Sequence, residues 1–336
     1  MPEAIAVELL SAGILAADKT AIGRALNLVE DRRSQAQLAI EDLLAKVTAA
    51  HPQGAGHRVG MTGPPGVGKS TLTAAVAREL RGRGQTVGIL AIDPSSTRSG
   101  GALLGDRARM SFDPAYAGLF VRSLSTAGDA GGLSYAAHAA ADVLAAAFDT
   151  VMIETTGVGQ SETDVEHIAD TVCLVIQPGS GDVLQFIKAG IMEIPDMLVV
   201  NKADHGRLAK RAANDLAGAL AAVRAVGVDA DSPWRVPVCL VSARDGQGIE
   251  EFVDILAAHR AALGEAGVCH RRRLGSLAWA CALFERKHGE HGVSVLGGRG
   301  VLRARATALL GQGQTALTAA RELSGAYLAA MAPAKH

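Results

Sequence analysis

The spacing of apolar residues near the start of the chain predicts helices. In residues 3–50, apolar side chains recur at helical intervals, as at Ile5, Leu9 and Ile14, and the surrounding sequence is rich in Ala, Leu, Glu and Arg. The segment HPQGAG (51–56) then interrupts the pattern with Pro and Gly, which indicates a linker.

Between residue 57 and about residue 262, short apolar runs alternate with helical stretches. The runs lie at 57–62, 86–92, 119–124, 150–154, 171–177, 197–201 and 236–242. Continuous apolar runs of this length, bounded by turn residues, suit strands that are buried on both faces. Their alternation with helices predicts an α/β fold with a mainly parallel sheet and helices on both sides. Ligands of such sheets bind beyond the carboxyl ends of the strands.

From about residue 266 onward the pattern is helical again, as in SLAWACALFERKH. This segment carries more apolar surface than an isolated tail can leave in water. The apolar residues are Leu274, Leu277, Trp279, Leu283, Phe284 and Val295. We expect them to form a homodimer interface; the alternative is that they fold back onto the central domain of their own chain.

Composition narrows the class of protein. The chain has 336 residues, 49% of them hydrophobic, which is enough for a sizeable core. Lys and Arg (33) balance Asp and Glu (34), so we expect no nucleic-acid partner. The one basic run, Arg271 to Arg273, is interpreted as a solvated linker or a helix start.

The cysteines and the apolar runs indicate the cellular compartment in which the protein is expected. The four cysteines contain no CxxC pair, and Cys173 and Cys239 lie in apolar runs, where Cys behaves as a small hydrophobe. We therefore expect a reducing, cytoplasmic setting without disulfides. The first residues, MPEAIAVELLSAG, lack a basic leader, and no apolar run is long enough to span a bilayer, so we expect no membrane association.

The segment GPPGVGKS matches the phosphate-binding pattern G-x-x-x-x-G-K-[ST], directly after an apolar strand and before a helical run. Backbone N–H groups of such a loop and the helix N-terminus favour phosphate oxygens. Lys69 is expected to reach the β- and γ-phosphates, and the Ser70 hydroxyl to bind Mg²⁺. The residues expected to contact the phosphates are Gly63, Pro64, Pro65, Gly66, Val67, Gly68, Lys69, Ser70 and Thr71.

A second motif, NKAD, follows the apolar run at 197–201 and predicts recognition of guanine. The carboxylate of Asp204 can accept hydrogen bonds from guanine N1–H and the exocyclic amine, a donor pair that adenine lacks. Asn201 and Lys202 complete the motif. After the next strand, Ser242, Ala243 and Arg244 are expected to supply backbone N–H contacts to the base. Together with the phosphate loop, these motifs predict a P-loop GTPase domain that binds GTP and GDP.

The run VMIETTGVG places an acidic residue, Glu154, where a strand would face Mg²⁺. Most GTPases carry Asp in D-x-x-G at this place, so the longer Glu suggests a contact through water. Gly157 can place a backbone N–H near the γ-phosphate. The next residue is Val158, so a water-orienting Gln is absent there, and Gln160 lies two residues further on.

Two polar loops are candidates for nucleotide-sensing switches. The loop at 93–110 is rich in Gly and Ser and contains Asp93 and Asp106, candidate ligands of magnesium or water; the alternative is a flexible surface loop. The loop at 177–188, which begins with QPGSGD, is the other candidate mobile element. The catalytic residues that we expect are Lys69, Asp93, Glu154 and Gly157. The expected magnesium ligands are Ser70, Asp93, Asp106 and Glu154.

Several of these strings together resemble one known family. GPPGVGKST, DPSSTRSGGALLGDR, ETTGVGQSE, QPGSGD and NKAD are similar to the MeaB/ArgK-type GTPases, a branch of the signal-recognition/MinD-like P-loop proteins with the methylmalonic aciduria type A protein as human counterpart. The resemblance implies a GTP-dependent chaperone of adenosylcobalamin-dependent methylmalonyl-CoA mutase. It also implies homodimers formed through the C-terminal helices, and positions near magnesium for Asp93, Asp106 and Glu154.

Two other functions share the phosphate loop. A nickel metallochaperone GTPase would need a loop rich in Cys and His, which the sequence lacks. A P-loop kinase would need an acceptor site, and NKAD disfavours ATP as the donor. We therefore expect a slow GTPase that a partner stimulates. Its predicted organisation is a helical extension over 1–55, a GTPase domain over 56–265 and a helical dimerisation arm over 266–336.

Overall fold

The computed structural model describes residues 2–51, 56–93, 117–125, 135–155, 165–179, 195–225 and 234–332. Its centre is a seven-stranded sheet in which every paired strand is parallel, in the order β3-β2-β4-β1-β5-β6-β7. The strands are β1 (His57–Thr62), β2 (Val87–Asp93), β3 (Leu119–Ser125), β4 (Thr150–Thr155), β5 (Thr171–Ile176), β6 (Met197–Val200) and β7 (Val238–Leu240). The predicted α/β fold is confirmed, because each predicted apolar run overlaps one of these strands.

Helices precede, connect and follow the strands. The N-terminal helices are α1 (Pro2–Leu15), α2 (Lys19–Val29) and α3 (Ser34–Ala49). The helices between strands are α4 (Lys69–Gly82), α6 (Tyr135–Ala147) and α9 (Arg207–Ala225), with short 3₁₀ turns η1 (Val165–His167) and η3 (Ala203–His205). The C-terminal helices are α10 (Ile249–Val295), α11 (Arg299–Gly311) and α12 (Ala316–Met331).

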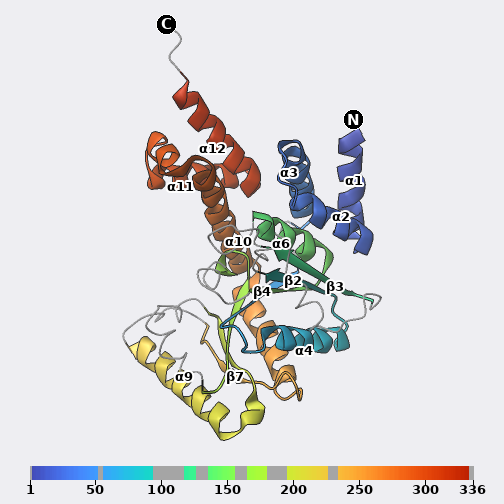
Figure 1. Ribbon diagram of the computed structural model, residues 1–336, viewed down its shortest axis with the longest axis vertical. Helices are drawn as coiled ribbons and strands as arrows, with labels where there is room; N and C mark the ends of the chain where they lie inside the picture. Colours follow the sequence, from blue (N-terminus) through green and yellow to red (C-terminus); the bar gives the residue numbers. More distant parts are fainter. Residues whose placement is uncertain are drawn as a thin grey trace, which may run out of the picture.

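Each face of the sheet has its own apolar core, because alternate residues of a strand point to opposite faces. On one face, Met61, Ile89 and Val175 pack with α4 and the first part of α10. On the other face, Leu90 and Ile153 pack against α6, and the N-terminal helices pack against α6 in turn. Helix α9 covers the strands nearest the β7 edge. Figure 1 shows α4 and α6 on opposite sides of the strands.

The long helix α10 passes from one face of the sheet to the other. Its first part contributes Phe252 and Leu256 to the core beside α4, whereas its later part contributes Leu277 and Phe284 to the core beside α6. Between these parts Gly264 has φ 59° and ψ −179°, which breaks the helical path. In Figure 1, α10 accordingly rises from the level of α4 to α11 and α12.

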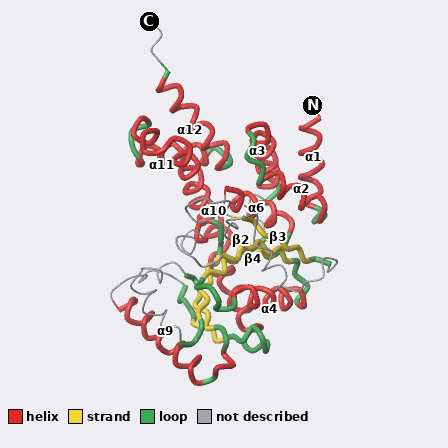
Figure 2. The backbone as a smooth tube through the Cα atoms, viewed as in Figure 1, coloured by secondary structure: helices red, strands yellow, loops and turns green. Residues whose placement is uncertain are grey.

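Several of the apolar residues that we expected to form a homodimer interface are buried by the packing of the later part of α10. Leu277, Trp279 and Phe284 are buried within the single chain, while Leu274 is 44% exposed. These three side chains of α10 therefore pack within their own chain. Figure 2 shows the first and last described helices, α1 and α12, at the same end of the molecule. Within the described residues, no helix combines the length and the apolar character that a membrane span requires.

Candidate nucleotide site

The phosphate-loop residues connect β1 to α4 at the carboxyl edge of the sheet. Two glycines there have positive φ and close neighbours. A Cβ on Gly63 (φ +136°) would lie 2.0 Å from the Val175 carbonyl oxygen, and one on Gly68 (φ +92°) would lie 2.6 Å from Asn201 Nδ2. These positions therefore need glycine for both conformation and space.

Lys69, the first residue of α4, is held by the loop that precedes it. Its Nζ donates hydrogen bonds to the carbonyl oxygens of Gly63 (2.7 Å) and Pro64 (3.0 Å), and the residue is only 6% exposed. The ammonium group thus lies inside the ring of loop residues. A phosphate oxygen there would accept a charge-assisted hydrogen bond, which is stronger than a bond to a neutral carbonyl.

Ser70 and Glu154 bring two motifs together across neighbouring strands. The Ser70 hydroxyl donates to Glu154 Oε1 at 2.5 Å, and Glu154 is buried near the end of β4. Because β1 and β4 are direct neighbours in the sheet, the helix start and the acidic residue meet at one edge. A hydroxyl and a carboxylate are hard oxygen ligands of the kind that Mg²⁺ takes.

Asn201 connects the guanine motif to the phosphate loop. Its Nδ2 donates to the Val67 carbonyl at 2.9 Å, and its Oδ1 accepts from the backbone N–H groups of Lys202 (2.8 Å) and Ala243 (3.2 Å). Asn201 is 2% exposed, so these bonds are shielded from water. The segments after β1, β6 and β7 are therefore fixed to one another through this side chain.

Asp204 lies beside the segment that follows β7. Its Oδ1 accepts from the Ser242 hydroxyl at 3.1 Å, and its Oδ2 lies 3.2 Å from Arg244 Nη2. Hydrogen bonding to Arg244 also lowers the pKa of Asp245. The structure thus places all the predicted base-contact residues together, with Asp204 turned toward Ser242 and Arg244.

One polar neighbour of this site was missed from the sequence. Gln177, directly after β5, accepts a hydrogen bond from Lys202 Nζ at 2.5 Å, and the same ammonium donates to the Gly66 carbonyl at 3.0 Å. Lys202 itself has φ +60°. The position of Gln177 directly after a predicted strand was the available signal. We had considered the loop that begins there only as a candidate switch.

Some predicted residues lie outside the described part of the chain. Asp106, Gly157 and Gln160 are among them, as is most of each proposed switch loop. Asp93 ends β2, with its backbone described and its side chain not. Among the described residues, no group of three or more His, Cys, Asp and Glu side chains could hold a metal ion.

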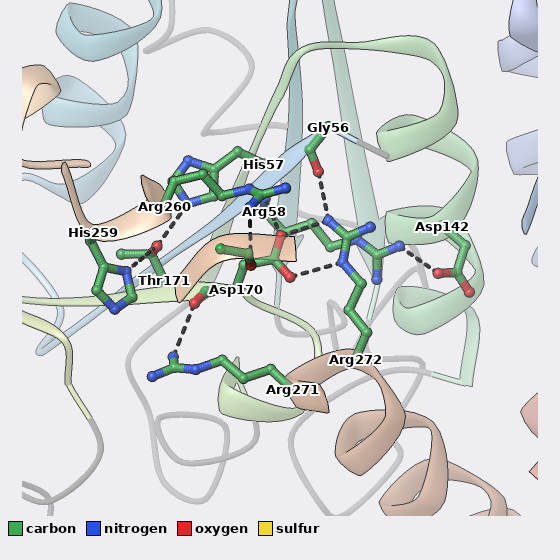
Figure 3. A network of polar contacts seen from close by, with 11 residues as sticks. Gly56, His57, Arg58, Asp142, Asp170, Thr171, His259, Arg260, Arg271 and Arg272 are labelled. Atoms are coloured by element: carbon green, nitrogen blue, oxygen red, sulfur yellow. Dashed lines mark hydrogen bonds and ion pairs between the residues drawn. The ribbon is translucent and has the colours of Figure 1, made fainter. Parts of the chain in front are cut away.

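A second polar cluster lies at the opposite edge of the sheet, where the strands begin (Figure 3). Asp170, just before β5, is completely buried and accepts from Arg272 Nη2 (2.6 Å) and from the backbone N–H of Arg58 (2.9 Å). Arg58 Nη2 in turn donates to Asp142 at 2.6 Å. Burial raises the pKa of Asp170, but hydrogen bonds and charge from Arg272 and Arg58 outweigh it and lower the pKa below its usual value.

Asp196, just before β6, has the same relation to α10. Both of its oxygens accept from Arg271 at 2.7 Å, and Oδ1 lies 3.3 Å from His259 Nε2. The Arg271–Arg273 run was interpreted as a solvated linker or a helix start; it lies within α10, and the solvated-linker interpretation was wrong for Arg271 and Arg272. Both guanidinium groups bind carboxylates at strand starts, and only Arg273 is exposed. An Asp immediately before each of two apolar runs was the signal in the sequence.

Comparison with known proteins gives matches over most of the chain. A family model described as "Methylmalonyl Co-A mutase-associated GTPase MeaB" matches residues 22–291. A Mycobacterium tuberculosis protein named "Probable GTPase" is 42% identical over 274 residues, 80% of this chain and 79% of that protein. The mitochondrial methylmalonic aciduria type A homologue of Mus musculus is 32% identical over 297 residues, 85% of this chain and 71% of that protein.

A solved structure is similar over nearly the whole chain. The crystal structure of LAO/AO transport system kinase has a TM-score of 0.62 at 25% identity, covering 95% of this chain and 96% of its own. The family match runs from α2 into the later part of α10, so it includes both the candidate nucleotide site and the second polar cluster.

Proposed function

Because this chain belongs to the MeaB family of GTPases, we propose that it is a GTP-dependent chaperone of adenosylcobalamin-dependent methylmalonyl-CoA mutase. In this role it would assist loading of the cobalamin cofactor and protect the mutase from inactivation. The mutase is named by the description of the matching family, and the relatives include animal methylmalonic aciduria type A homologues.

The observation that carries the nucleotide part is the link that Asn201 makes between two motifs. Its amide holds the phosphate loop at Val67 and the base-contact segment at Ala243. A guanine bound at Asp204 and phosphates bound at Lys69 would thus have their sites fixed relative to one another. We assign guanine recognition to Asp204 with the Ser242–Arg244 segment, and phosphate binding to the loop residues and Lys69.

We propose that GTP binds together with Mg²⁺, held by Ser70 and by Glu154 directly or through water. The oxygen donors of these two side chains fit this ion, and they already lie within hydrogen-bonding distance. The ion would neutralise charge on the β- and γ-phosphates. Asp93 and Asp106 remain candidates for the same ion from the family resemblance.

Hydrolysis by the isolated protein should be slow. The sequence places Val158, rather than Gln, after Gly157, so no side chain at that position orients the attacking water. We expect roughly one turnover per minute or less, as for GTPases that await a partner. Contact with the mutase would raise the rate by ordering the loops around the γ-phosphate.

The decisive experiment combines this protein with purified methylmalonyl-CoA mutase. GTP hydrolysis is measured with and without the mutase, and mutase affinity is measured with GDP and with a non-hydrolysable GTP analogue. We expect faster hydrolysis and a nucleotide-dependent affinity. By linkage, the nucleotide state that the mutase prefers must bind this protein more tightly by the same factor when the mutase is present.

The Lys69→Ala variant is the control for that experiment. Any stimulated hydrolysis must disappear with it, because removing this ammonium takes away positive charge where negative charge develops. Stimulation that survives in the variant would point to a contaminating GTPase. If the natural protein gives neither stimulation nor nucleotide-dependent affinity, the chaperone role is refuted while the GTPase assignment stands.

We further propose that the chain forms a homodimer through the C-terminal helices, as the family resemblance implies. Leu328 and Met331 on α12 are 60% and 50% exposed, which leaves apolar surface on this arm. Light scattering should give the mass of two chains for the natural protein and of one chain for the double variant Leu328→Glu, Met331→Glu. An unchanged dimer in the variant would remove α12 from the interface.

The alternatives considered from the sequence are not favoured. The family match and the animal relatives support neither a nickel metallochaperone nor a kinase. The word kinase in the name of the similar crystal structure applies to that protein and is not evidence for kinase activity here. A direct check is phosphate transfer: this protein should release inorganic phosphate from GTP and label no small-molecule acceptor.

A further inference from the structure

Gln177 is the first residue after β5, and the place of β5 in the sheet puts this residue between two motifs of the nucleotide site. Strand β5 pairs with β1 on one side and with β6 on the other. The phosphate loop follows β1, and the NKAD motif follows β6. Because the carboxyl ends of parallel strands lie at one edge of a sheet, the residue after β5 lies between the loops that follow β1 and β6.

The side chain of Gln177 is bonded to one of these motifs. Its Oε1 accepts a hydrogen bond from Lys202 Nζ at 2.5 Å, and the same Nζ donates to the Gly66 carbonyl at 3.0 Å. One ammonium group therefore joins three segments of chain, those that follow β1, β5 and β6. Gln177 and Lys202 are both half-buried, so water competes less for the bond between them than it would at an open surface.

The backbone of Lys202 has a conformation that its neighbours must hold. Its φ is +60° and its ψ is 43°, in the left-handed region, which is uncommon for a residue with a side chain. The Asn201 side chain accepts from the backbone N–H of Lys202 at 2.8 Å. Lys202 is thus fixed at its main chain and at its ammonium, between the residue that binds the phosphate loop and Asp204.

The Gln177 oxygen is a second fixed acceptor for a flexible side chain. A lysine has a four-carbon stem with many rotamers, and this freedom opposes any interaction that must fix the ammonium. A side chain that the protein already holds loses less freedom when a ligand binds, so binding is tighter. We propose that Gln177 is a positioning residue for guanine-nucleotide binding and that it acts through Lys202.

Gln177 and the proposed magnesium site lie on opposite sides of β1. Strand β5, which Gln177 follows, pairs with one edge of β1, whereas β4, which carries Glu154, pairs with the other. Loss of the Gln177–Lys202 contact should therefore weaken the binding of GDP and of GTP alike. It should raise KM and leave the chemical step unchanged. The inference rests on the nucleotide site proposed above and does not involve the mutase.

The first variant is Gln177→Met, which removes the acceptor from a side chain of similar length. Titration calorimetry of the full chain with Mg²⁺ measures the affinity for GDP and for a non-hydrolysable GTP analogue. We expect both dissociation constants to rise by the same factor, roughly 5–30-fold. KM for GTP hydrolysis should rise by that factor while kcat is retained. Gln177→Glu keeps an oxygen acceptor and should restore most of the GDP affinity.

A double-mutant cycle tests whether Gln177 acts through Lys202. Lys202→Met removes the ammonium, and by itself it should weaken GDP binding at least as much as Gln177→Met does. In the Lys202→Met background, Gln177→Met should have no further effect, because its partner is already absent.

The matched control is Gln85→Met. Gln85 is also half-buried, and its Oε1 also accepts a hydrogen bond, from the Thr150 hydroxyl at 2.9 Å. It precedes β2, however, so it lies at the edge of the sheet where the strands begin. Gln85→Met should leave GDP affinity unchanged. Circular dichroism verifies that every variant is folded.

The outcomes separate this inference from the nucleotide site itself. The inference is overturned, and the nucleotide site stands, if Gln177→Met binds GDP like the natural chain while Lys202→Met binds it more weakly. It is also overturned if Gln177→Met has the same effect in both backgrounds, if Gln85→Met causes an equal loss, or if the loss is confined to GTP. If Lys202→Met and Asp204→Asn both leave GDP affinity unchanged, the proposed base site fails, and this inference fails with it.

Discussion

Asn201 uses both ends of its amide to hold the protein itself together. Its nitrogen binds the phosphate loop, and its oxygen binds the backbone of Lys202 and Ala243. The sequence could predict that NKAD contacts guanine, because its spacing after a strand is distinctive. The sequence could not predict that Asn201 links these segments, because its partners Val67 and Ala243 lie 134 and 42 residues away and leave no local pattern.

Asp204 provides the sharpest test of base recognition at the residue scale. Asp204→Asn removes the charged acceptor for guanine N1–H and its amine, so GTP affinity should fall by roughly 2–4 kcal/mol. The new amide can donate to the C2 carbonyl of xanthosine triphosphate, which should become the better ligand. Titration calorimetry measures both affinities.

The matched control is Asp245→Asn, which changes a neighbouring carboxylate that also binds Ser242 and Arg244. Its base preference should stay with guanine. Unchanged GTP affinity in Asp204→Asn, or an equal loss in both variants, would contradict the role given to Asp204.

The Ser70→Ala variant tests the proposed magnesium site. Ser70→Ala removes one oxygen donor beside Glu154, so it should weaken GTP binding in the presence of Mg²⁺. The same variant should bind GDP in EDTA nearly as well as the natural chain does, which serves as the internal control. An equal loss under both conditions would show that Ser70 acts on the loop rather than on an ion.

At the scale of elements, the strands were predictable and the path of α10 was not. Apolar runs bounded by turn residues mark strands of a buried parallel sheet, and each of the seven predicted runs overlaps one. The ion pairs that bind α10 to the sheet join residues 75 and 102 positions apart. Such contacts are invisible to a pattern that extends over a few turns of helix.

Arg272 tests how strongly α10 is held at the strand starts. Its side chain is 16% exposed and that of Asp170 is 0% exposed. Arg272→Met leaves a buried carboxylate without its main partner, so the free energy of unfolding should fall by roughly 3–5 kcal/mol. Urea denaturation measures the change.

Arg273→Met is the control because Arg273 is the exposed neighbour on the same helix. Its effect should stay within about 0.5 kcal/mol. Equal effects of the two substitutions would mean that the Asp170 pair contributes little.

At the scale of the whole molecule, two partly buried histidines should make folding sensitive to mild acid. Burial lowers the pKa of His57 to about 4 and that of His138 to about 3. Below about pH 6.5 the unfolded chain takes up protons that the folded chain refuses. Stability is therefore complete above this pH and falls as pH decreases toward the folded-state values, by up to about 1.4 kcal/mol per pH unit for each histidine.

His138→Phe isolates one of these contributions. A phenyl ring can keep the stack that His138 makes on Trp279, with ring centroids 4.7 Å apart. The slope of unfolding free energy against pH between 6 and 4.5 should fall by about half, measured by urea denaturation at each pH. His270→Phe, at an exposed position, should leave the slope unchanged; a natural slope in His138→Phe would refute the assignment.

The passage of α10 around the starts of the strands has a consequence for how the protein is made. The Gly56 carbonyl accepts from Arg272, which the ribosome adds 216 residues later. At bacterial and eukaryotic elongation rates that interval is roughly 10–40 s. Asp170 is synthesised 102 residues before Arg272 and Asp196 75 residues before Arg271, so for roughly 4–20 s these carboxylates are present without their arginines. The nascent chain therefore lacks these two ion pairs until late in its synthesis, and a chain cut short before residue 271 never forms them.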